Sequence, residues 1–426
     1  MEIFVRPKRN EWSDLSRRNT PENIVTVDET VADIIKLVAS NGDSALRQLS
    51  LKFDNVDISD FRVSDSEINE AVAKVRPEVA KAIDAAARNI EKFHEAQLME
   101  RPIDVEISKG VRCQQRQIPI NTVGLYIPGG RAPLFSTVLM LAIPARIAGC
   151  RRRILCTPYN AERGIAPEII YAAKICGVDE IYKVGGAQSI AAMAYGTESI
   201  PRVDKIFGPG NRFVTCAKQL VMNRVAIDMP AGPSEVMVMA DQSASPRYVA
   251  ADLLSQAEHG PDSQAILVTD DLAFAQRVED EVSSLATQLS RIDSVAGSLS
   301  QSRLIVLDSR DEMIDFANEY ASEHLIISMS DPWDVANEIT SAGSVFIGNY
   351  SPESAGDYAS GTNHTLPTSG WAKAYSGVNI DSFMKKITYQ ELSKDGLSSL
   401  AETIIAMADA EGLDAHALAV KVRISD

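Results

Sequence analysis

The sequence lacks the features of secreted, membrane-spanning and nucleic-acid-binding proteins. Its five cysteines are odd in number and never form a CxxC pair, which indicates reduced thiols and argues against a cysteine zinc site. Basic residues number 42 against 58 acidic ones, and the net charge of −16 disfavours nucleic acid as a partner. The N-terminus has no apolar segment of signal-peptide length, and the most apolar stretch, 132–150, is interrupted by prolines and an arginine. We therefore expect a cytoplasmic protein without a membrane span.

The first hundred residues have the periodicity of helices. Residues 30–49 are amphipathic with a break at Gly42–Asp43, and the pattern resumes over 65–97. A further helix is expected at 396–410, where leucine, isoleucine and methionine follow one stripe. With 426 residues, no internal repeat and no flexible linker, the chain is long enough for about two to three domains.

The middle of the chain alternates short apolar runs with helix-length ones, the pattern of a parallel, doubly wound sheet. Helices are expected at 136–148 and 187–195. Expected strands of this first unit are 122–127, 153–156, 180–184, 205–207 and 225–227. A second α/β unit is indicated by candidate strands at 265–269, 304–307, 325–328 and 344–347.

Glycine-rich turns follow three strands of the first unit, although none is a GxGxxG motif. They are Pro128-Gly129-Gly130, Gly185-Gly186 and Gly208-Pro209-Gly210. Each stands between a strand and a helix, where a phosphate can approach the backbone and the helix N–H groups. A single turn of this kind is typical of an ordinary tight connection, but three in one sheet favour a nucleotide crevice. Asp228, at a later strand end, is a candidate for contacting a ribose.

The five histidines are unevenly distributed. His94 lies on an early amphipathic helix, where a structural role is expected, whereas His259, His324, His364 and His416 all follow residue 258. Imidazole is the commonest metal ligand and general base in proteins. Any one of the four taken alone would usually be structural, but together they indicate a single site.

Two of these histidines have informative neighbours. Gln256 and His259 are three residues apart at a predicted helix end, so both project from one face. Glu323 and His324 form an adjacent acid and imidazole suited to proton transfer. This pair precedes its strand, whereas parallel sheets bind ligands beyond the carboxyl ends of strands. Either the site draws on another domain or subunit, or the strand assignment is wrong.

The segment 353–370 is rich in glycine, serine, threonine and asparagine and contains Asp357 and His364. A structureless loop of this length inside a compact domain is uncommon and usually functional.

Seven segments of the chain resemble the histidinol dehydrogenase family, in the order in which that family has them. They are VGLYIPGGRAPLFSTVLMLAIPARIAGC, VGGAQSIAAMAYGT, VDKIFGPGN, IDMPAGPSEV, LLSQAEHGPDSQ, SEHLI and SAGSVFIGNYSPESAGDYASGTNHTLPTSG. Several are long and peculiar to the family, and the resemblance extends over essentially the whole chain.

The resemblance implies a role for each residue that matches a family motif. The zinc ligands, one ion per subunit, fall on Gln256, His259, Asp357 and His416. The general base falls on His324 and its acidic partner on Glu323. The remaining substrate contacts fall on Ser234, His364 and Glu411, in addition to His324 and the zinc ligands, and the NAD contacts fall on Tyr126, Gln188 and Asn211.

The resemblance also implies an intertwined homodimer of α/β subunits, each with two Rossmann-like doubly wound domains and small terminal helical pieces. Residues 1–22 form an N-terminal arm, and residues 23–121 with 235–378 form a larger domain carrying the zinc and catalytic residues. Residues 122–234 form the NAD-binding domain, and 379–426 form a helical tail that reaches the partner subunit.

The implied reaction is the NAD-dependent oxidation of L-histidinol through L-histidinaldehyde to L-histidine, the last steps of histidine biosynthesis. Three alternatives remain. The chain could oxidise a different hydroxyl substrate, which the retained Ser234, His364 and Glu411 disfavour. It could be a zinc hydrolase or an idle zinc-binding module, which the glycine turns and the Glu323–His324 pair disfavour. The aldehyde step could also use a thiohemiacetal on Cys113 or Cys150, whose arginine neighbours would lower a thiol pKa.

Overall fold

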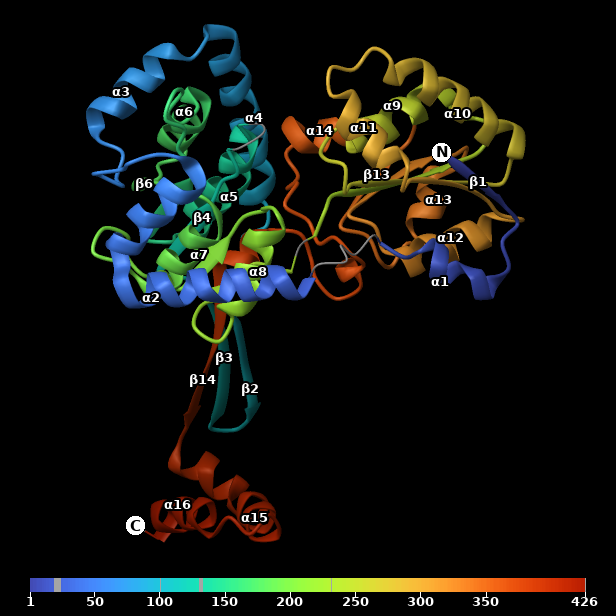
Figure 1. The fold of residues 1–426 in the computed structure, drawn as a ribbon. Coiled ribbons are helices and arrows are strands. Elements are labelled where there is room, and N and C mark those ends of the chain that lie inside the picture. The colour runs from blue at the N-terminus through green and yellow to red at the C-terminus, as the bar shows by residue number, and fades with distance from the viewer. Residues whose placement is uncertain (19–23, 100, 130–132, 231, 426) are drawn as a thin grey trace.

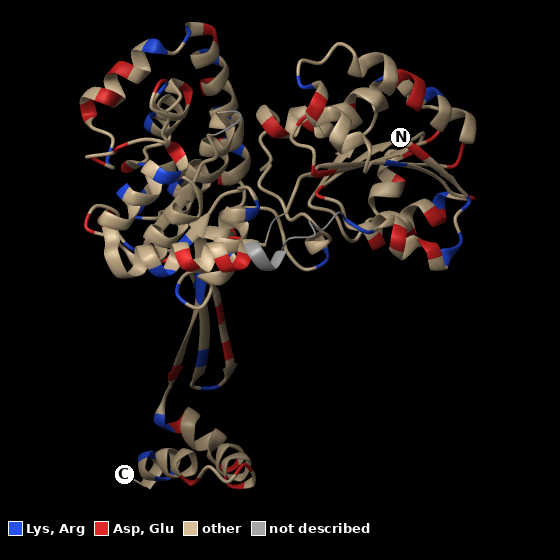
Figure 2. Ribbon diagram, viewed as in Figure 1, with Lys and Arg blue, Asp and Glu red and all other residues tan. Residues whose placement is uncertain are grey.

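The computed structural model describes residues 1–18, 24–99, 101–129, 133–230 and 232–425. Two lobes lie side by side, and a narrow stalk descends from one of them to a pair of helices (Figure 1). Acidic residues are spread over both lobes rather than gathered on one face (Figure 2). No helix in the described ranges is long and apolar enough to cross a membrane.

One lobe, which we call the smaller lobe after its smaller sheet, is built on a five-stranded parallel sheet in the order β6-β5-β4-β7-β8. Its strands are β4 (Thr122–Tyr126), β5 (Arg152–Thr157), β6 (Glu180–Lys183), β7 (Lys205–Phe207) and β8 (Ala226–Ile227). The intervening helices are α5 (Phe135–Ala148), α6 (Pro167–Ile175), α7 (Gly186–Tyr195) and α8 (Arg212–Leu220). Successive residues of β5 enter different cores, Leu155 on the α5–α6 side and Cys156 on the α7–α8 side, because side chains alternate along a strand. The five strands expected from the sequence are confirmed.

The early helices belong to this smaller lobe, which corrects the expected grouping of residues 23–121 with 235–378. They are α2 (Ile24–Asp54), α3 (Asp65–Lys74) and α4 (Pro77–Glu95). Val31 and Leu46 of α2 share a core with α7, and Ile83 and Ile90 of α4 share one with α5. An amphipathic pattern shows that a helix has a buried face but not which sheet covers it.

Two interruptions shape these helices. Gly42 has φ 50° and ψ −130°, so α2 is kinked at the break expected at Gly42–Asp43. The periodic stretch 65–97 divides into α3 and α4 because Pro77 occupies the first turn of α4 and its predecessor Arg76 is extended.

The larger lobe is built on a six-stranded parallel sheet in the order β1-β11-β10-β9-β12-β13. Its strands are β1 (Glu2–Val5), β9 (Glu235–Ala240), β10 (Gln264–Thr269), β11 (Arg303–Val306), β12 (His324–Ser328) and β13 (Ser344–Ile347). On one face pack α9 (Pro246–Ala257), α10 (Leu272–Ala286) and α11 (Ile292–Leu299). On the other pack α1 (Trp12–Leu15), α12 (Arg310–Tyr320) and α13 (Pro332–Ala336). The four strands expected in this unit are confirmed; the N-terminal segment supplies a fifth at the sheet edge, and the central strand β9 is a sixth.

The stalk is an antiparallel sheet of β2 (Ile103–Ser108), β3 (Val111–Pro119) and β14 (Met384–Leu392). It ends in α15 (Lys394–Ala410) and α16 (Asp414–Ser425), which lie far from both lobes (Figure 1). The tail expected to be helical over 379–426 therefore includes the strand β14 before its two α-helices, and residues 103–119 belong to the stalk rather than to either α/β unit. Short elements complete the chain: η1 (Arg9–Glu11), α14 (Glu353–Tyr358), η2 (Trp371–Lys373) and η3 (Ile380–Phe383).

Candidate functional site

Several candidate residues meet at the amino ends of three neighbouring strands in the larger sheet. His324 is the first residue of β12 and is in register with Val236 of the central strand β9. Ser234 directly precedes β9, and Gln256 and His259 lie at the end of α9, just before β10. The strand expected at 325–328 is confirmed but begins one residue earlier, at His324, so that only Glu323 precedes it. The cluster therefore lies at the edge opposite to the one where ligands of parallel sheets usually bind.

The segment 353–370 returns the chain to this edge. It opens with the short helix α14 instead of being wholly irregular, and it brings Asp357 and His364 to the cluster. The Nε2 atom of His324 lies 3.8 Å from Oδ1 of Asp357. His364 donates from Nδ1 to the Asp357 carbonyl at 2.9 Å, and its Nε2 lies 3.3 Å from the Thr137 hydroxyl on α5 of the other lobe. The site thus lies where the two lobes meet.

His324 has a defined tautomer. Its Nδ1 donates to the backbone carbonyl of Glu235 at 3.2 Å, because a carbonyl can only accept. Its Nε2 is buried and has no hydrogen-bond partner among the described residues. Burial lowers the pKa of His324 to about 3, so the ring is neutral near pH 7. A neutral imidazole with one free lone pair can accept a proton.

The acidic groups of the cluster are also buried. The Oε2 atom of Glu323 accepts the Glu235 N–H at 2.9 Å, and burial raises the pKa of Glu323 well above its usual range. Burial likewise raises the pKa of Glu353 and brings that of Asp357 to about 6. Buried carboxyl groups favour a nearby cation, which would offset the cost of their desolvation.

The donor set fits a metal ion. One ligand atom each of His259, Glu353 and Asp357 lie within 4.8 Å of one another. The side-chain nitrogen of the buried Gln256 donates to the Glu235 carbonyl at 3.2 Å and to Oε1 of Glu353 at 2.9 Å. The reverse amide orientation would set its oxygen against two acceptors. In this orientation the Gln256 oxygen points away from both acceptors, and nitrogen and oxygen donors of this kind suit zinc.

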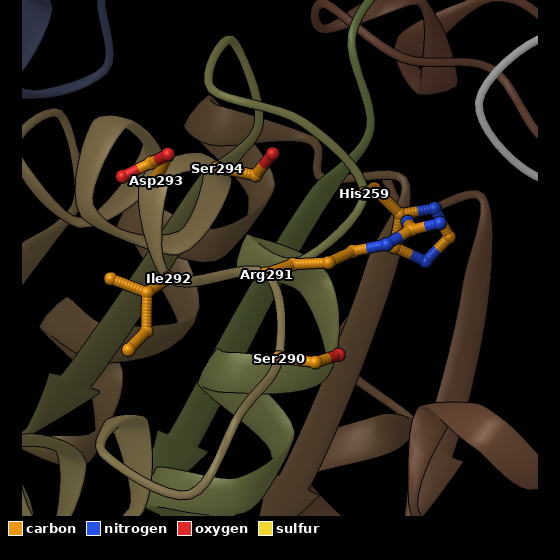
Figure 3. Close-up of a pocket in the computed structure, with 6 residues that line it drawn as sticks. All are labelled: His259, Ser290, Arg291, Ile292, Asp293 and Ser294. Carbon is orange, nitrogen blue, oxygen red and sulfur yellow. The ribbon is translucent and has the colours of Figure 1, made fainter.

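A pocket of about 350 Å³ opens beside His259, which is exposed on this side. Residues 290–294 line the rest of it, and the Arg291 side chain points toward the imidazole of His259 (Figure 3). Of the cluster residues, His259 is the one that lines this pocket.

Glu411 and His416 are not brought to the cluster by this chain. Both are exposed in the helical pair at the end of the stalk, and Figure 1 shows that pair away from both lobes.

The candidate NAD contacts lie at the carboxyl edge of the smaller sheet. Tyr126 ends β4, and its hydroxyl accepts the Gly186 N–H at 3.3 Å; Gln188 lies in the first turn of α7. Asn211 is the N-cap of α8, and its side chain accepts from two backbone N–H groups of the first turn. Gly208 has φ 128°, and a Cβ there would collide with the Tyr126 carbonyl, so this turn requires glycine. Gly130, in the first of the three turns, lies outside the described residues.

Two sequence hypotheses about single residues can now be judged. The Asp228 carboxylate pairs with the buried Lys218 and accepts two backbone N–H groups, and its side chain is only 1% exposed, so it is not presented to a ribose. His94 is structural as expected, since it is buried and its Nδ1 donates to the Ile90 carbonyl at 2.8 Å.

The structure contradicts the thiohemiacetal hypothesis for Cys150 and gives it no support for Cys113. Cys113 lies on the stalk strand β3. Cys150 lies at the amino edge of the smaller sheet, just before β5, and burial raises the pKa of its thiol to about 11 despite the nearby Arg153. A buried, protonated thiol on the other lobe cannot serve the cluster.

Three residues of the site were not predicted from the sequence: Glu235, Glu353 and Arg18. Glu353 contacts Gln256, and Arg18 forms an ion pair with the buried Glu235 side chain at 3.0 Å. The uninterrupted apolar run of β9, which starts at Glu235, was the available signal that this carboxylate would be buried.

Comparison with known proteins identifies the relatives of this chain. A family model described as histidinol dehydrogenase matches residues 16–424. The histidinol dehydrogenase of Bacteroides fragilis (strain YCH46) is 53% identical over 100% of this chain and 99% of its own length. That of Salmonella typhimurium (strain LT2) is 54% identical over 94% of this chain and 92% of its own length. The crystal structure of histidinol dehydrogenase from Elizabethkingia anophelis superposes with a TM-score of 0.96 at 50% identity, covering 100% of this chain and 98% of that one.

Proposed function

The chain belongs to the histidinol dehydrogenase family, whose activity forms the final steps of histidine biosynthesis, and on that premise we propose that it oxidises L-histidinol to L-histidine in two NAD-dependent steps. The observation that carries the mechanism is the state of His324: Nδ1 is held by the Glu235 carbonyl, and the buried Nε2 has no partner among the described residues.

His324 is the base in both oxidations. In the first, its Nε2 accepts the hydroxyl proton while a hydride leaves the carbinol carbon, which gives the aldehyde. His324 then releases this proton to solvent. In the second oxidation, Glu323 helps to activate a water molecule that attacks the aldehyde, and His324 accepts the hydroxyl proton of the resulting hydrate while the second hydride leaves. The lowered pKa of His324 keeps the ring in the form that can accept a proton. NAD, when bound, supplies the acceptor for each hydride.

Gln256, His259 and Asp357, with His416 of the partner subunit, would hold a zinc ion, one per subunit. Zinc, when bound, supplies an anchor that orients the imidazole and amino groups of the substrate. Glu353 lies in the same cluster, but its carboxylate accepts the Gln256 amide, so we assign it to orienting that ligand. Ser234, His364 and Glu411 would complete the substrate contacts.

The smaller lobe is the proposed NAD-binding domain. Its strand order is that of a Rossmann-like sheet, with the first strand, β4, beside the fourth, β7. Tyr126, Gln188 and Asn211 surround its carboxyl edge, where the first turns of α7 and α8 offer N–H groups to a pyrophosphate.

The proposed assembly is an intertwined homodimer in which each stalk carries Glu411 and His416 to the partner's site. The exposure of both residues at the end of the stalk supports this arrangement. The unpaired cysteines agree with a cytoplasmic location.

One assay tests the proposed activity against its rivals. Purified enzyme is mixed with L-histidinol and NAD, and NADH formation is followed by absorbance. Two NADH per histidinol are expected, with histidine as the product. A dehydrogenase for another substrate would leave histidinol unchanged but reduce NAD with its own alcohol, and a hydrolase or an idle zinc protein would form no NADH with either.

A further inference from the structure

One backbone segment contacts three of the proposed functional side chains. The Glu235 N–H donates to Oε2 of Glu323 at 2.9 Å. The Glu235 carbonyl accepts from Nδ1 of His324 at 3.2 Å and from the Gln256 amide at 3.2 Å. The base, its acidic partner and an amide ligand therefore depend on the position of a single residue at the start of β9.

The side chain of Glu235 is itself held by Arg18. The Nε and Nη2 atoms of Arg18 donate to the two carboxylate oxygens, each at 3.0 Å, and the Ser369 N–H donates to Oε1 at 2.7 Å. The Glu235 carboxylate is only 2% exposed. A two-point contact of this kind fixes orientation as well as distance.

Arg18 is positioned from its other side by Tyr320. Its Nη2 also donates to the Tyr320 carbonyl at 2.6 Å, and the guanidinium carbon lies 3.6 Å from the centre of the Tyr320 ring. Arg18 thereby ties the N-terminal segment to the end of α12 and the start of β9.

We propose that Arg18 is a positioning residue of the active site, which acts through Glu235 to set Glu323, His324 and Gln256 at the same time. This inference rests on the proposed function, because the roles of those three side chains come from it. Arg18 touches none of them, so its effect must pass through the Glu235 backbone. Loss of the Arg18–Glu235 ion pair would therefore disturb proton transfer and zinc binding together. Loss of His324 alone would mainly disturb proton transfer, and loss of Gln256 alone would mainly disturb zinc binding.

The test compares Arg18→Met and Arg18→Lys with Arg17→Met, which changes an exposed neighbouring arginine that pairs with Asp14 at the surface. Zinc affinity is measured by competition with a chromophoric chelator, with zinc as the only added probe. The kcat and KM for histidinol are then measured at saturating zinc. Thermal unfolding is recorded for each variant so that assays are run well below its midpoint.

Arg18→Met should weaken zinc binding about 10–100-fold, the usual effect of losing an outer-shell partner, and should lower kcat about 100-fold, as expected for a small misplacement of reacting groups. Lysine keeps the charge but not the planar fork, so Arg18→Lys should recover only part of both losses. Arg17→Met should match the wild type in both measurements.

If Arg18→Met does not fold, a double-mutant cycle of Glu235→Gln and Arg18→Lys still tests the proposal. Glu235→Gln and Arg18→Lys should each weaken zinc binding and lower kcat, and the double variant should be little worse than either, because both remove one interaction. Independent, multiplying losses would overturn the proposal. So would an Arg18→Met or Arg18→Lys enzyme that unfolds at a lower temperature but keeps wild-type zinc affinity and kcat. If the wild type binds zinc but forms no NADH from histidinol, the proposed function fails, and the zinc measurements still decide whether Arg18 positions Gln256.

Discussion

Two inactive variants should restore activity when they are combined in one dimer. One chain carries His416→Ala in the tail, and the other carries Gln256→Ala at the end of α9. In the proposed dimer each metal site takes Gln256 from one chain and His416 from the other. The mixed dimer therefore has one intact site and one site that lacks both ligands, whereas each parent dimer has a lesion in both sites.

The geometry of the stalk supports this expectation. Strand β14 pairs with β3 over nine residue pairs, from Met384–Pro119 to Leu392–Val111. At about 3.3 Å per residue, such a strand carries the tail about 30 Å along the stalk. Zinc needs its ligands within about 2.3 Å, so a tail that served its own chain would have to dismantle this ladder.

The expected yield follows from pairing statistics. Random exchange between equal amounts of the two variants makes about half of the dimers mixed, and each mixed dimer has one working site in two. The mixture should thus reach about a quarter of the wild-type rate per chain, and a mixed dimer purified through two different tags about half. NADH formation from histidinol is the assay, with each variant alone as the control. A purified mixed dimer as inactive as its parents would refute the shared site.

Four further predictions concern single residues. His324→Asn should nearly abolish turnover but retain zinc, as measured by metal analysis; loss of the metal would make His324 a ligand instead of the base. Glu323→Gln should slow aldehyde oxidation more than alcohol oxidation, because only the former consumes water; equal single-turnover losses with the two substrates would remove its assigned role. Cys113→Ala and Cys150→Ala should keep most of the activity in the same NADH assay, since neither thiol lies at the cluster; accumulation of aldehyde would contradict this. The pKa of His94 is lowered by burial, so the unfolded chain binds this proton more readily and stability should fall as the pH drops below about 6.5. His94→Gln should flatten that fall in denaturant titrations, and an unchanged slope would exclude the contribution.

Much of the α/β architecture can be predicted from the sequence because its buried strands are short apolar runs between turn residues. The central strand β9 is also such a run, but it was missed because a continuous run of valines and methionines has no periodicity that distinguishes a buried strand from a buried helix segment. The stalk does not follow this pattern, because all six residues of β2 are exposed and the pairing partner of β3 lies far along the chain in β14.

The candidate site was predictable where the chemistry belongs to a single side chain. Histidines and carboxylates in unusual local settings, such as Glu323 beside His324, can be recognised from the sequence. The roles of Glu235 and Arg18 exist only as contacts between segments that are far apart in the chain. Amphipathic patterns likewise could not assign α2 to the smaller lobe, since they do not say which sheet a helix covers.

The proposed binding regions lie at opposite edges of the two sheets, at the carboxyl edge of the smaller sheet and at the amino edge of the larger one. The charge that each region attracts differs as a result. At the carboxyl edge of the smaller sheet, α7 and α8 present their N-terminal ends, where the helix dipole is positive and a pyrophosphate is attracted. At the amino edge of the larger sheet, α9 presents its C-terminal end beside Gln256, where the dipole is negative and attracts a metal ion or an ammonium group. Because the two α/β units use opposite sheet edges, the helix dipoles at their two binding regions have opposite signs. In the proposed enzyme the anionic cofactor and the cationic substrate would each be attracted to its own half, and the carboxyl groups of Glu353 and Asp357 add to the dipole of α9.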